Sequence, residues 1–61
     1  MHTYTFVAES VDTEFQKKYL VNAMDRMIAF ADAMPRILQD PIWETEELHC
    51  IFLESIRYTK S

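Results

Sequence analysis

Residues 20–34 have the sequence Leu-Val-Asn-Ala-Met-Asp-Arg-Met-Ile-Ala-Phe-Ala-Asp-Ala-Met, and this stretch decides the fold that we predict. Its apolar residues recur at alternating spacings of four and three, at Leu20, Met24, Met27, Ala31 and Met34. The opposite face is mostly polar, with Lys18, Asn22, Asp25, Ala29 and Asp32. This period is typical of an amphipathic α-helix. We therefore expect one long helix from about Thr13 to Ala33, with Asp12 as its N-cap.

The residues before this stretch predict a short strand. In residues 3–8, Thr-Tyr-Thr-Phe-Val-Ala, the side chains of Tyr4, Phe6 and Ala8 alternate onto one face. All but Ala8 are β-branched or aromatic, as strands prefer. A single strand cannot satisfy its own backbone hydrogen bonds, so it needs a partner from the C-terminal half or from another chain.

The residues after the long helix allow two interpretations. Pro35 and Pro41 interrupt helical structure and predict a corner. A second helix is favoured from Thr45 onwards, because one of its faces would then be largely apolar, with Leu48, Ile51, Phe52, Ser55 and Ile56. In the alternative, residues 45–59 contain a strand that pairs with residues 3–8, although Glu54 interrupts its apolar face.

These elements predict a single small domain, residues 1–61, of the mainly α class. It would contain a short N-terminal strand, a long amphipathic helix, a proline-punctuated corner and a second helix packed antiparallel on the first. The chain has no glycine, which disfavours tight two-residue hairpins and favours a helical layout. The alternative is an α+β fold, a β-α-β unit with the C-terminal segment as a strand.

The size and composition of the chain favour association with another molecule. A domain of 61 residues has marginal stability, and its one cysteine cannot form an internal disulfide. Nevertheless 49% of its residues are hydrophobic, which is more than so small a chain can bury alone. We therefore expect docking on a protein partner or self-association as a homo-oligomer, and no small-molecule substrate.

The net charge and the N-terminal residues indicate which partners and which cellular compartment to expect. The formal net charge of −4 disfavours direct binding to nucleic acid or to anionic membranes. The N-terminal residues lack the pattern of a signal peptide, and the longest apolar run, residues 51–53, is too short to span a bilayer. With the lone cysteine, these features predict a cytoplasmic protein.

Catalytic, metal-binding and cofactor-binding motifs are not evident. His2, His49 and Cys50 are the only soft metal ligands, and the adjacent pair would point to different faces of a helix or strand. The absence of glycine excludes the loops that bind nucleotide phosphates. We therefore predict a protein that is not an enzyme, with no metal and no cofactor.

An acidic cluster and several aromatic residues are candidates for partner binding. Glu44, Glu46 and Glu47 could mimic nucleic-acid phosphates, extended by Asp25, Asp32 and Asp40, although interleaved basic residues weaken this hypothesis. Trp43 lies between two breaks, where tryptophan often anchors an interface. Methionine suits adaptable binding surfaces. The predicted contact residues are Trp43, Glu44, Glu46, Glu47, Met24, Met27, Tyr4 and Tyr58.

The leading functional hypothesis is a small acidic protein-binding module. Its size and charge are typical of stoichiometric inhibitors or regulators of a larger enzyme or nucleic-acid-processing complex, including viral proteins that block host defence. One alternative is a homo-oligomeric structural element, in which the methionine-rich helix packs against its copy. The other alternative is a nucleic-acid mimic.

Overall fold

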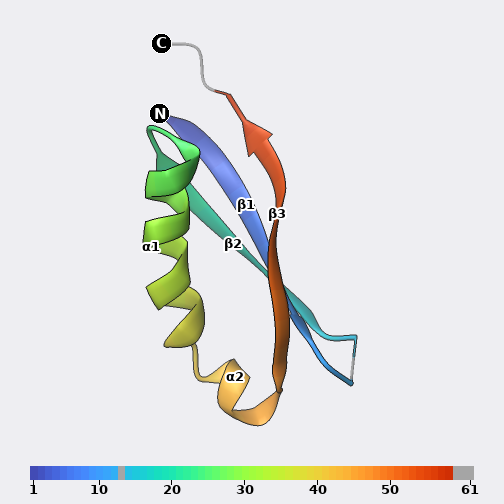
Figure 1. The fold of residues 1–61 in the computed structure, drawn as a ribbon. Coiled ribbons are helices and arrows are strands. Elements are labelled where there is room, and N and C mark those ends of the chain that lie inside the picture. Colours follow the sequence, from blue (N-terminus) through green and yellow to red (C-terminus); the bar gives the residue numbers. More distant parts are fainter. Residues whose placement is uncertain (13, 59–61) are drawn as a thin grey trace.

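The computed structural model describes residues 1–12 and 14–58, which form a three-stranded sheet with one long helix on one face (Figure 1). The elements in chain order are β1 (His2–Ser10), β2 (Gln16–Ala23), α1 (Arg26–Leu38), α2 (Ile42–Thr45) and β3 (Leu48–Arg57). The strand order is β2-β1-β3, and both pairs are antiparallel. The chain therefore has an α+β fold.

The central strand β1 builds the core with alternate side chains. Tyr4, Phe6 and Ala8 are buried on the face that carries α1, as period-two alternation in a strand requires. On β2, Val21 lies opposite Tyr4 and Tyr19 lies opposite Phe6. These cross-strand pairs place the aromatic rings beneath the helix.

The edge strand β3 needs two bulges to keep its apolar residues in phase. Leu53 and Ile56 are three residues apart, yet they lie opposite Phe6 and Tyr4, which are two apart. A register shift between Thr5 and Phe6 absorbs the extra residue, and a second shift lies between Glu9 and Ser10. The bulges therefore bring the apolar row of β3 onto the same face as the core of β1.

Helix α1 begins at a side-chain cap and buries a row of small residues. Asp25 is the N-cap, and its carboxylate accepts a hydrogen bond of 2.9 Å from the backbone N–H of Ile28. Ala29, Ala33 and Ile37, each four residues apart, are buried against the sheet. The two alanines let the helix approach the aromatic rings of β1 and β2 closely.

The mainly α prediction is wrong. Residues 16–23 form β2 and not the first half of a helix, because Tyr19, Val21 and Ala23 alternate into the core while Lys18, Leu20 and Asn22 face outwards. Asp12 lies in the connection between β1 and β2 and caps no helix. Thr13, the expected helix start, lies outside the described residues.

The predicted second helix is also wrong, because residues 48–57 form β3. The alternative interpretation correctly pairs this segment with the N-terminal strand but omits β2. The corner expected near the prolines contains the single turn of α2, which ends at Thr45. Pro35 does not end α1 but lies exposed in its last turn, where the carbonyl that it leaves without an N–H partner can face water.

Candidate functional site

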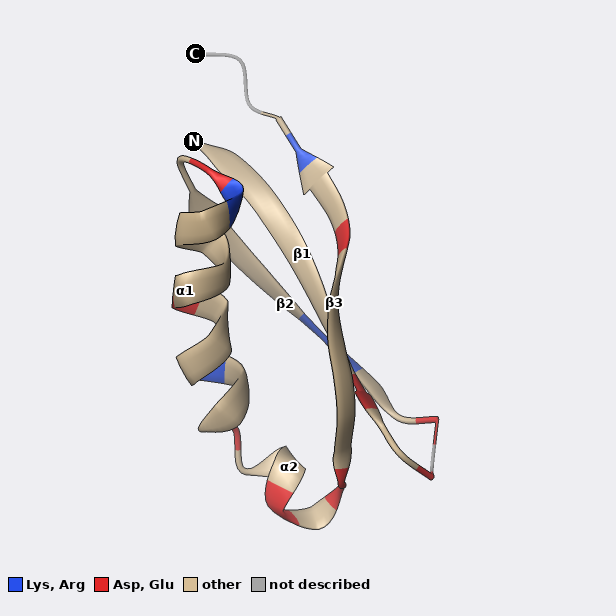
Figure 2. Cartoon of the chain, in the orientation of Figure 1, with Lys and Arg blue, Asp and Glu red and all other residues tan. Residues whose placement is uncertain are grey.

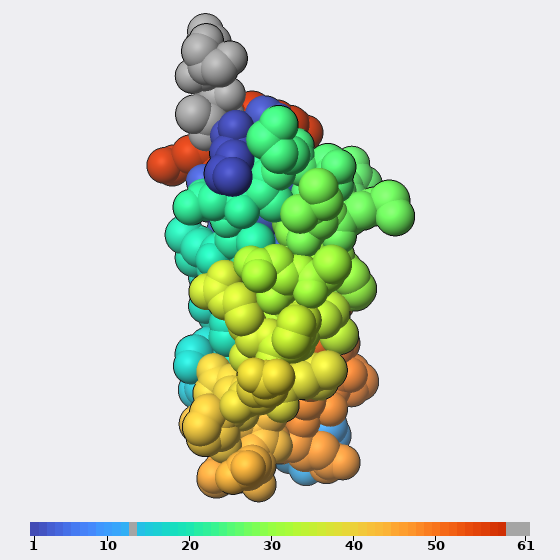
Figure 3. Space-filling view, turned by 90° about the vertical axis from the view of Figure 1, so that its left-hand side faces the viewer, coloured from blue at the N-terminus to red at the C-terminus, as the bar shows by residue number. Residues whose placement is uncertain are grey.

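Helix α1 is apolar on its outer side as well as on its buried side. Only three of its thirteen residues are polar, Arg26, Asp32 and Arg36. Its exposed apolar side chains, with the exposed fraction of each, are Met27 (83%), Leu38 (63%), Ile28 (52%) and Phe30 (50%), and Met24 (65%) precedes the helix. Figure 3 shows α1 running along the surface with no other element over it. A helix that is apolar on nearly all sides is typically buried on all sides.

The helix covers β2 and β1 and leaves β3 largely uncovered. The guanidinium of Arg36 donates a 3.2 Å hydrogen bond to the backbone oxygen of Leu20 and lies 3.5 Å from Asp32, which turns the polar side of α1 towards β2. Phe30 lies on the other side, with its ring 6.1 Å from the ring of Phe6 on the central strand. The apolar flank of α1 therefore faces the row on β3.

The dimensions of the two layers explain why this area stays open. Thirteen helical residues span about 20 Å, with a diameter of about 10 Å. Ten strand residues span about 33 Å, and neighbouring strands lie about 4.8 Å apart. One helix of this length covers roughly half of one face of the sheet. Accordingly Ile51, Leu53 and Ile56 on β3 are only partly buried.

We call this open apolar area the α1–β3 surface. It consists of Met27, Phe30, Ala31, Met34 and Leu38 from α1 with Ile51, Leu53 and Ile56 from β3. At its upper end a shallow cavity of about 270 Å³ is lined by Arg26, Met27 and Phe30. A concave apolar area with a charged residue at its rim is typical of a site where a protein side chain docks.

A polar network fixes the lower end of α1 to β2. The carboxylate of Asp40 accepts hydrogen bonds from the ammonium of Lys17 at 2.5 Å and from the hydroxyl of Tyr19 at 2.7 Å. The backbone N–H of Ile42 donates to its other oxygen at 3.1 Å. These donors, Lys17 first, lower the pKa of Asp40 to about 2. Because its charge is satisfied on three sides, Asp40 is a structural anchor.

Trp43 belongs to the same network. Its indole N–H donates a 3.0 Å hydrogen bond to the hydroxyl of Tyr19, and its ring lies edge-on to Phe15 with the centroids 5.7 Å apart. The half-buried indole thus connects α2 to the start of β2. The structure places this predicted interface residue where it holds two loops of the chain together.

Figure 2 shows a cluster of acidic residues at one end of the molecule, with others before α1, within α1 and on β3. The connection between β1 and β2 carries Asp12 and Glu14, and it joins the connection after α2 through a 2.9 Å hydrogen bond from the N–H of Val11 to the oxygen of Glu47. Glu44 and Glu46 lie in the same region. At the opposite end lie Arg26 and Arg57.

The three aspartates predicted to extend the acidic cluster each make a contact within the fold. Asp25 caps α1 at the far end, Asp32 faces Arg36, and Asp40 is held by Lys17. The three aspartates expected to extend the glutamate cluster are therefore occupied within the fold. The acids that do extend it, Asp12 and Glu14, come from a turn that sequence reasoning placed at a helix start.

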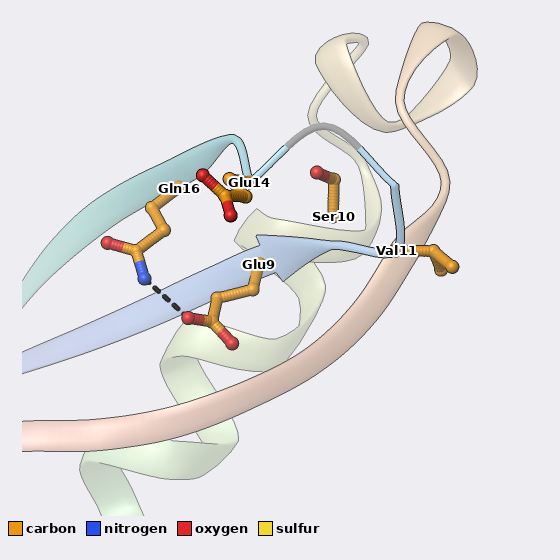
Figure 4. A pocket seen from close by; sticks show the side chains of 5 residues that line it. All are labelled: Glu9, Ser10, Val11, Glu14 and Gln16. Carbon is orange, nitrogen blue, oxygen red and sulfur yellow. Dashed lines mark hydrogen bonds between the residues drawn. The ribbon is translucent and has the colours of Figure 1, made fainter.

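An open depression of about 420 Å³ lies beside this acidic end, lined by Glu9, Ser10, Val11, Glu14 and Gln16 (Figure 4). The carboxylate of Glu9 accepts hydrogen bonds from the amide of Gln16 and, at 3.2 Å, from the thiol of Cys50. The thiol contact lowers the pKa of Glu9, and the same contact raises the pKa of Cys50. Cys50 is thus held as a thiol, which is a poor nucleophile. Within residues 1–12 and 14–58, no group of His, Cys, Asp and Glu residues is arranged to hold a metal ion.

The open face of the sheet is more polar than the α1 side. Lys18 and Glu54 form an ion pair of 3.1 Å across it, and the hydroxyl of Thr3 donates a 2.8 Å hydrogen bond to the amide oxygen of Asn22. Leu20 and Phe52 are its exposed apolar side chains. These residues offer matched controls for variants on the α1–β3 surface.

The predicted contact residues do not form one site. Met27 belongs to the α1–β3 surface, and Met24 lies just before α1. Tyr4 is buried beneath α1, where only 3% of its surface is exposed, so a partner cannot reach it in the folded chain. Tyr58 is exposed after β3, with its ring 4.8 Å from that of His2.

The contact residues predicted from the sequence do not include the rest of the α1–β3 surface, chiefly Phe30, Leu38 and the apolar row of β3. The sequence does indicate that Phe30 and Leu38 are available for binding, because residues 26–38 are apolar on more faces of the helix than one sheet can bury. The signal for β3 is masked, because its bulges break the alternation on which a strand is recognised.

Comparison of the chain with protein-family models, with curated proteins and with solved structures gives no match. Among the described residues, neither helix has the length and apolar character that crossing a membrane requires.

Proposed function

We propose that this chain is a cytoplasmic protein-binding module that docks another polypeptide on the α1–β3 surface. The observation that carries the proposal is the outer face of α1, whose methionine, leucine, isoleucine and phenylalanine are left exposed by the part of the chain that the structure describes. A contiguous apolar area of this kind on a small domain marks an interaction site.

The exposed apolar side chains of this surface supply a substantial part of the free energy that binding requires. The exposed fractions of Met27, Phe30 and Leu38 together amount to about two whole side chains. Burying a large apolar side chain contributes about 1.5–3 kcal/mol, so these three residues offer on the order of 3–6 kcal/mol. Association costs an estimated 4–15 kcal/mol in lost freedom, and the partner's own apolar side chains supply the rest of the gain.

The acidic residues at its lower end favour a partner with basic residues beside the apolar ones that meet this end. Glu44, Glu46 and Glu47 lie beyond the lower end of α1. Opposite charge across the rim of an interface speeds encounter and sets orientation. Such a module acts by occupying a surface of its partner, in the manner of a stoichiometric regulator. Neither the structure nor the comparisons supports a viral origin, so we propose no viral role.

Site-specific crosslinking tests the proposal. A photoreactive amino acid is placed at Met27 in the full chain, and the variant is irradiated in the cells that produce the protein. The matched control places the same group at Leu20, which is 59% exposed on the opposite face of the sheet. Mass spectrometry then identifies every product.

We expect one dominant product from position 27 and none at comparable yield from position 20. Substitution of Leu38 by Asp in the position-27 variant should abolish that product, because a buried unpaired charge opposes docking. Equal yields from the two positions, or no product from position 27, would contradict the proposal.

A further inference from the structure

The outer face of α1 carries the spacing of a helix–helix seam. Met27, Ala31, Met34 and Leu38 are separated by four, three and four residues, which places them on one stripe that runs the length of the helix. This is the spacing with which two helices pack side by side at a small crossing angle. The stripe lies next to the buried row of Ala29, Ala33 and Ile37, so the sheet leaves it uncovered.

The charges at the two ends of α1 determine the direction of that helix. Arg26 is the first residue of α1, and Glu44, Glu46 and Glu47 follow its other end. A second copy packed parallel would bring the two glutamate clusters together. A second copy packed antiparallel brings each Arg26 close to the glutamates of the other copy, which is the complementary arrangement.

We propose that the occupant of this seam is a second copy of this chain, whose α1 packs antiparallel on the first α1 about a twofold axis perpendicular to the helix near its middle. This inference rests on the proposed function and specifies the partner. Met27 of one copy then lies opposite Leu38 of the other, and Ala31 lies opposite Met34. The small side chain of Ala31 beside the axis allows the helices to approach closely.

Packed in this way, the exposed stripe of each copy covers the same stripe of the other copy. A self-complementary surface of this kind closes after two copies.

Sedimentation equilibrium of the wild-type chain and three variants tests the dimer. We expect the wild type to be dimeric at about 100 µM. Met27→Asp and Leu38→Asp should each weaken the dimer at least about 100-fold, while circular dichroism keeps the wild-type spectrum, because both side chains are exposed in the single chain. The matched control Leu20→Asp should leave the dimer unchanged. A monomeric wild type, or equal weakening by Leu20→Asp, would overturn the proposal.

Thiol crosslinking tests the direction of the helices in a Cys50→Ser background. Antiparallel packing predicts that a mixture of the Met27→Cys and Leu38→Cys chains gives a heterodimer with a short bismaleimide, and that neither chain alone crosslinks efficiently. Efficient crosslinking of Met27→Cys with itself would refute the antiparallel arrangement. If the wild type is monomeric but the photoproduct at position 27 contains another polypeptide, the self-association proposal fails and the proposed binding function stands.

Discussion

Substitution of two neighbouring residues of α1 separates the part of the helix that stabilises the chain from the part available for binding. Ile37 is fully buried against the sheet, whereas 63% of the next residue, Leu38, is exposed. Both side chains have four carbons, and both would be cut to alanine. The chemical change is thus nearly the same, and only the environment differs.

Ile37→Ala should destabilise the fold severely. Removing a buried isoleucine side chain costs about 2–5 kcal/mol, because the cavity adds to the lost transfer free energy. A 61-residue domain has a total stability of about 3–9 kcal/mol. The substitution therefore removes a large part of the free energy of unfolding. At about 4–8 °C per kcal/mol, Tm should fall by 10 °C or more, on the order of what such small domains show.

Leu38→Ala should cost less than about 1 kcal/mol in the single chain, since exposed substitutions have small effects and alanine favours the helix. The assay is urea unfolding followed by circular dichroism at about 1 µM, where dimers contribute little, and again at about 100 µM. The difference between wild type and Leu38→Ala should grow with concentration. Equal destabilisation by the two substitutions at the low concentration would refute the division of α1 into a core face and a binding face.

Three further predictions concern single contacts. The pKa of Asp40 is about 2 in the folded chain against an ordinary 3.8, so the unfolded chain takes up the proton first as the pH falls. The stabilisation from Asp40 is complete above about pH 4 and is lost towards pH 2, and Asp40→Asn should flatten the acid unfolding profile in that window. Glu14 has a φ of 55°, in the left-handed region where a side chain is disfavoured, so Glu14→Gly should raise the free energy of unfolding by up to about 1 kcal/mol in urea titrations. Asp25→Ala removes the cap of α1 and should lower the free energy of unfolding by about 0.5–2 kcal/mol, whereas Asp25→Ser should lower it by much less.

The sequence predicts β1 well because its apolar side chains alternate without interruption. In β2, by contrast, the two-residue period of a strand coincides with part of a helical pattern. Tyr19, Val21 and Ala23 alternate as a strand requires. Leu20 is exposed on the open face of the sheet, yet its spacing to Met24 and Met27 continues the helical pattern. Because Leu20 fits the helical spacing, the predicted helix included residues 16–23, which form β2. Asp25 was the available boundary signal, since an aspartate two residues before the apolar run that begins at Met27 is a typical N-cap.

The hairpin between β1 and β2 could not be predicted from turn chemistry. The chain has no glycine, and a two-residue turn would need one or an equivalent residue. The structure uses a longer connection, in which Glu14 adopts a positive φ and the side-chain oxygen of Ser10 accepts a 3.1 Å hydrogen bond from the N–H of Phe15. The lack of glycine disfavours the shortest turn but leaves longer connections open.

The spacing of four and three that misplaced the start of the helix nevertheless describes its outer face correctly. The spacing of apolar residues along a helix reflects every surface on which the helix packs, whether that surface belongs to its own chain or to a partner. In the folded chain the sheet buries Ala29, Ala33 and Ile37, which are spaced by four, and this row leaves Met27, Ala31, Met34 and Leu38 exposed or half-buried. A helix of a self-sufficient monomer would carry polar residues on that second row. The apolar residues of α1 that the monomer's own core does not bury are the ones that indicate a partner. In this chain their spacing is the one with which a second helix packs.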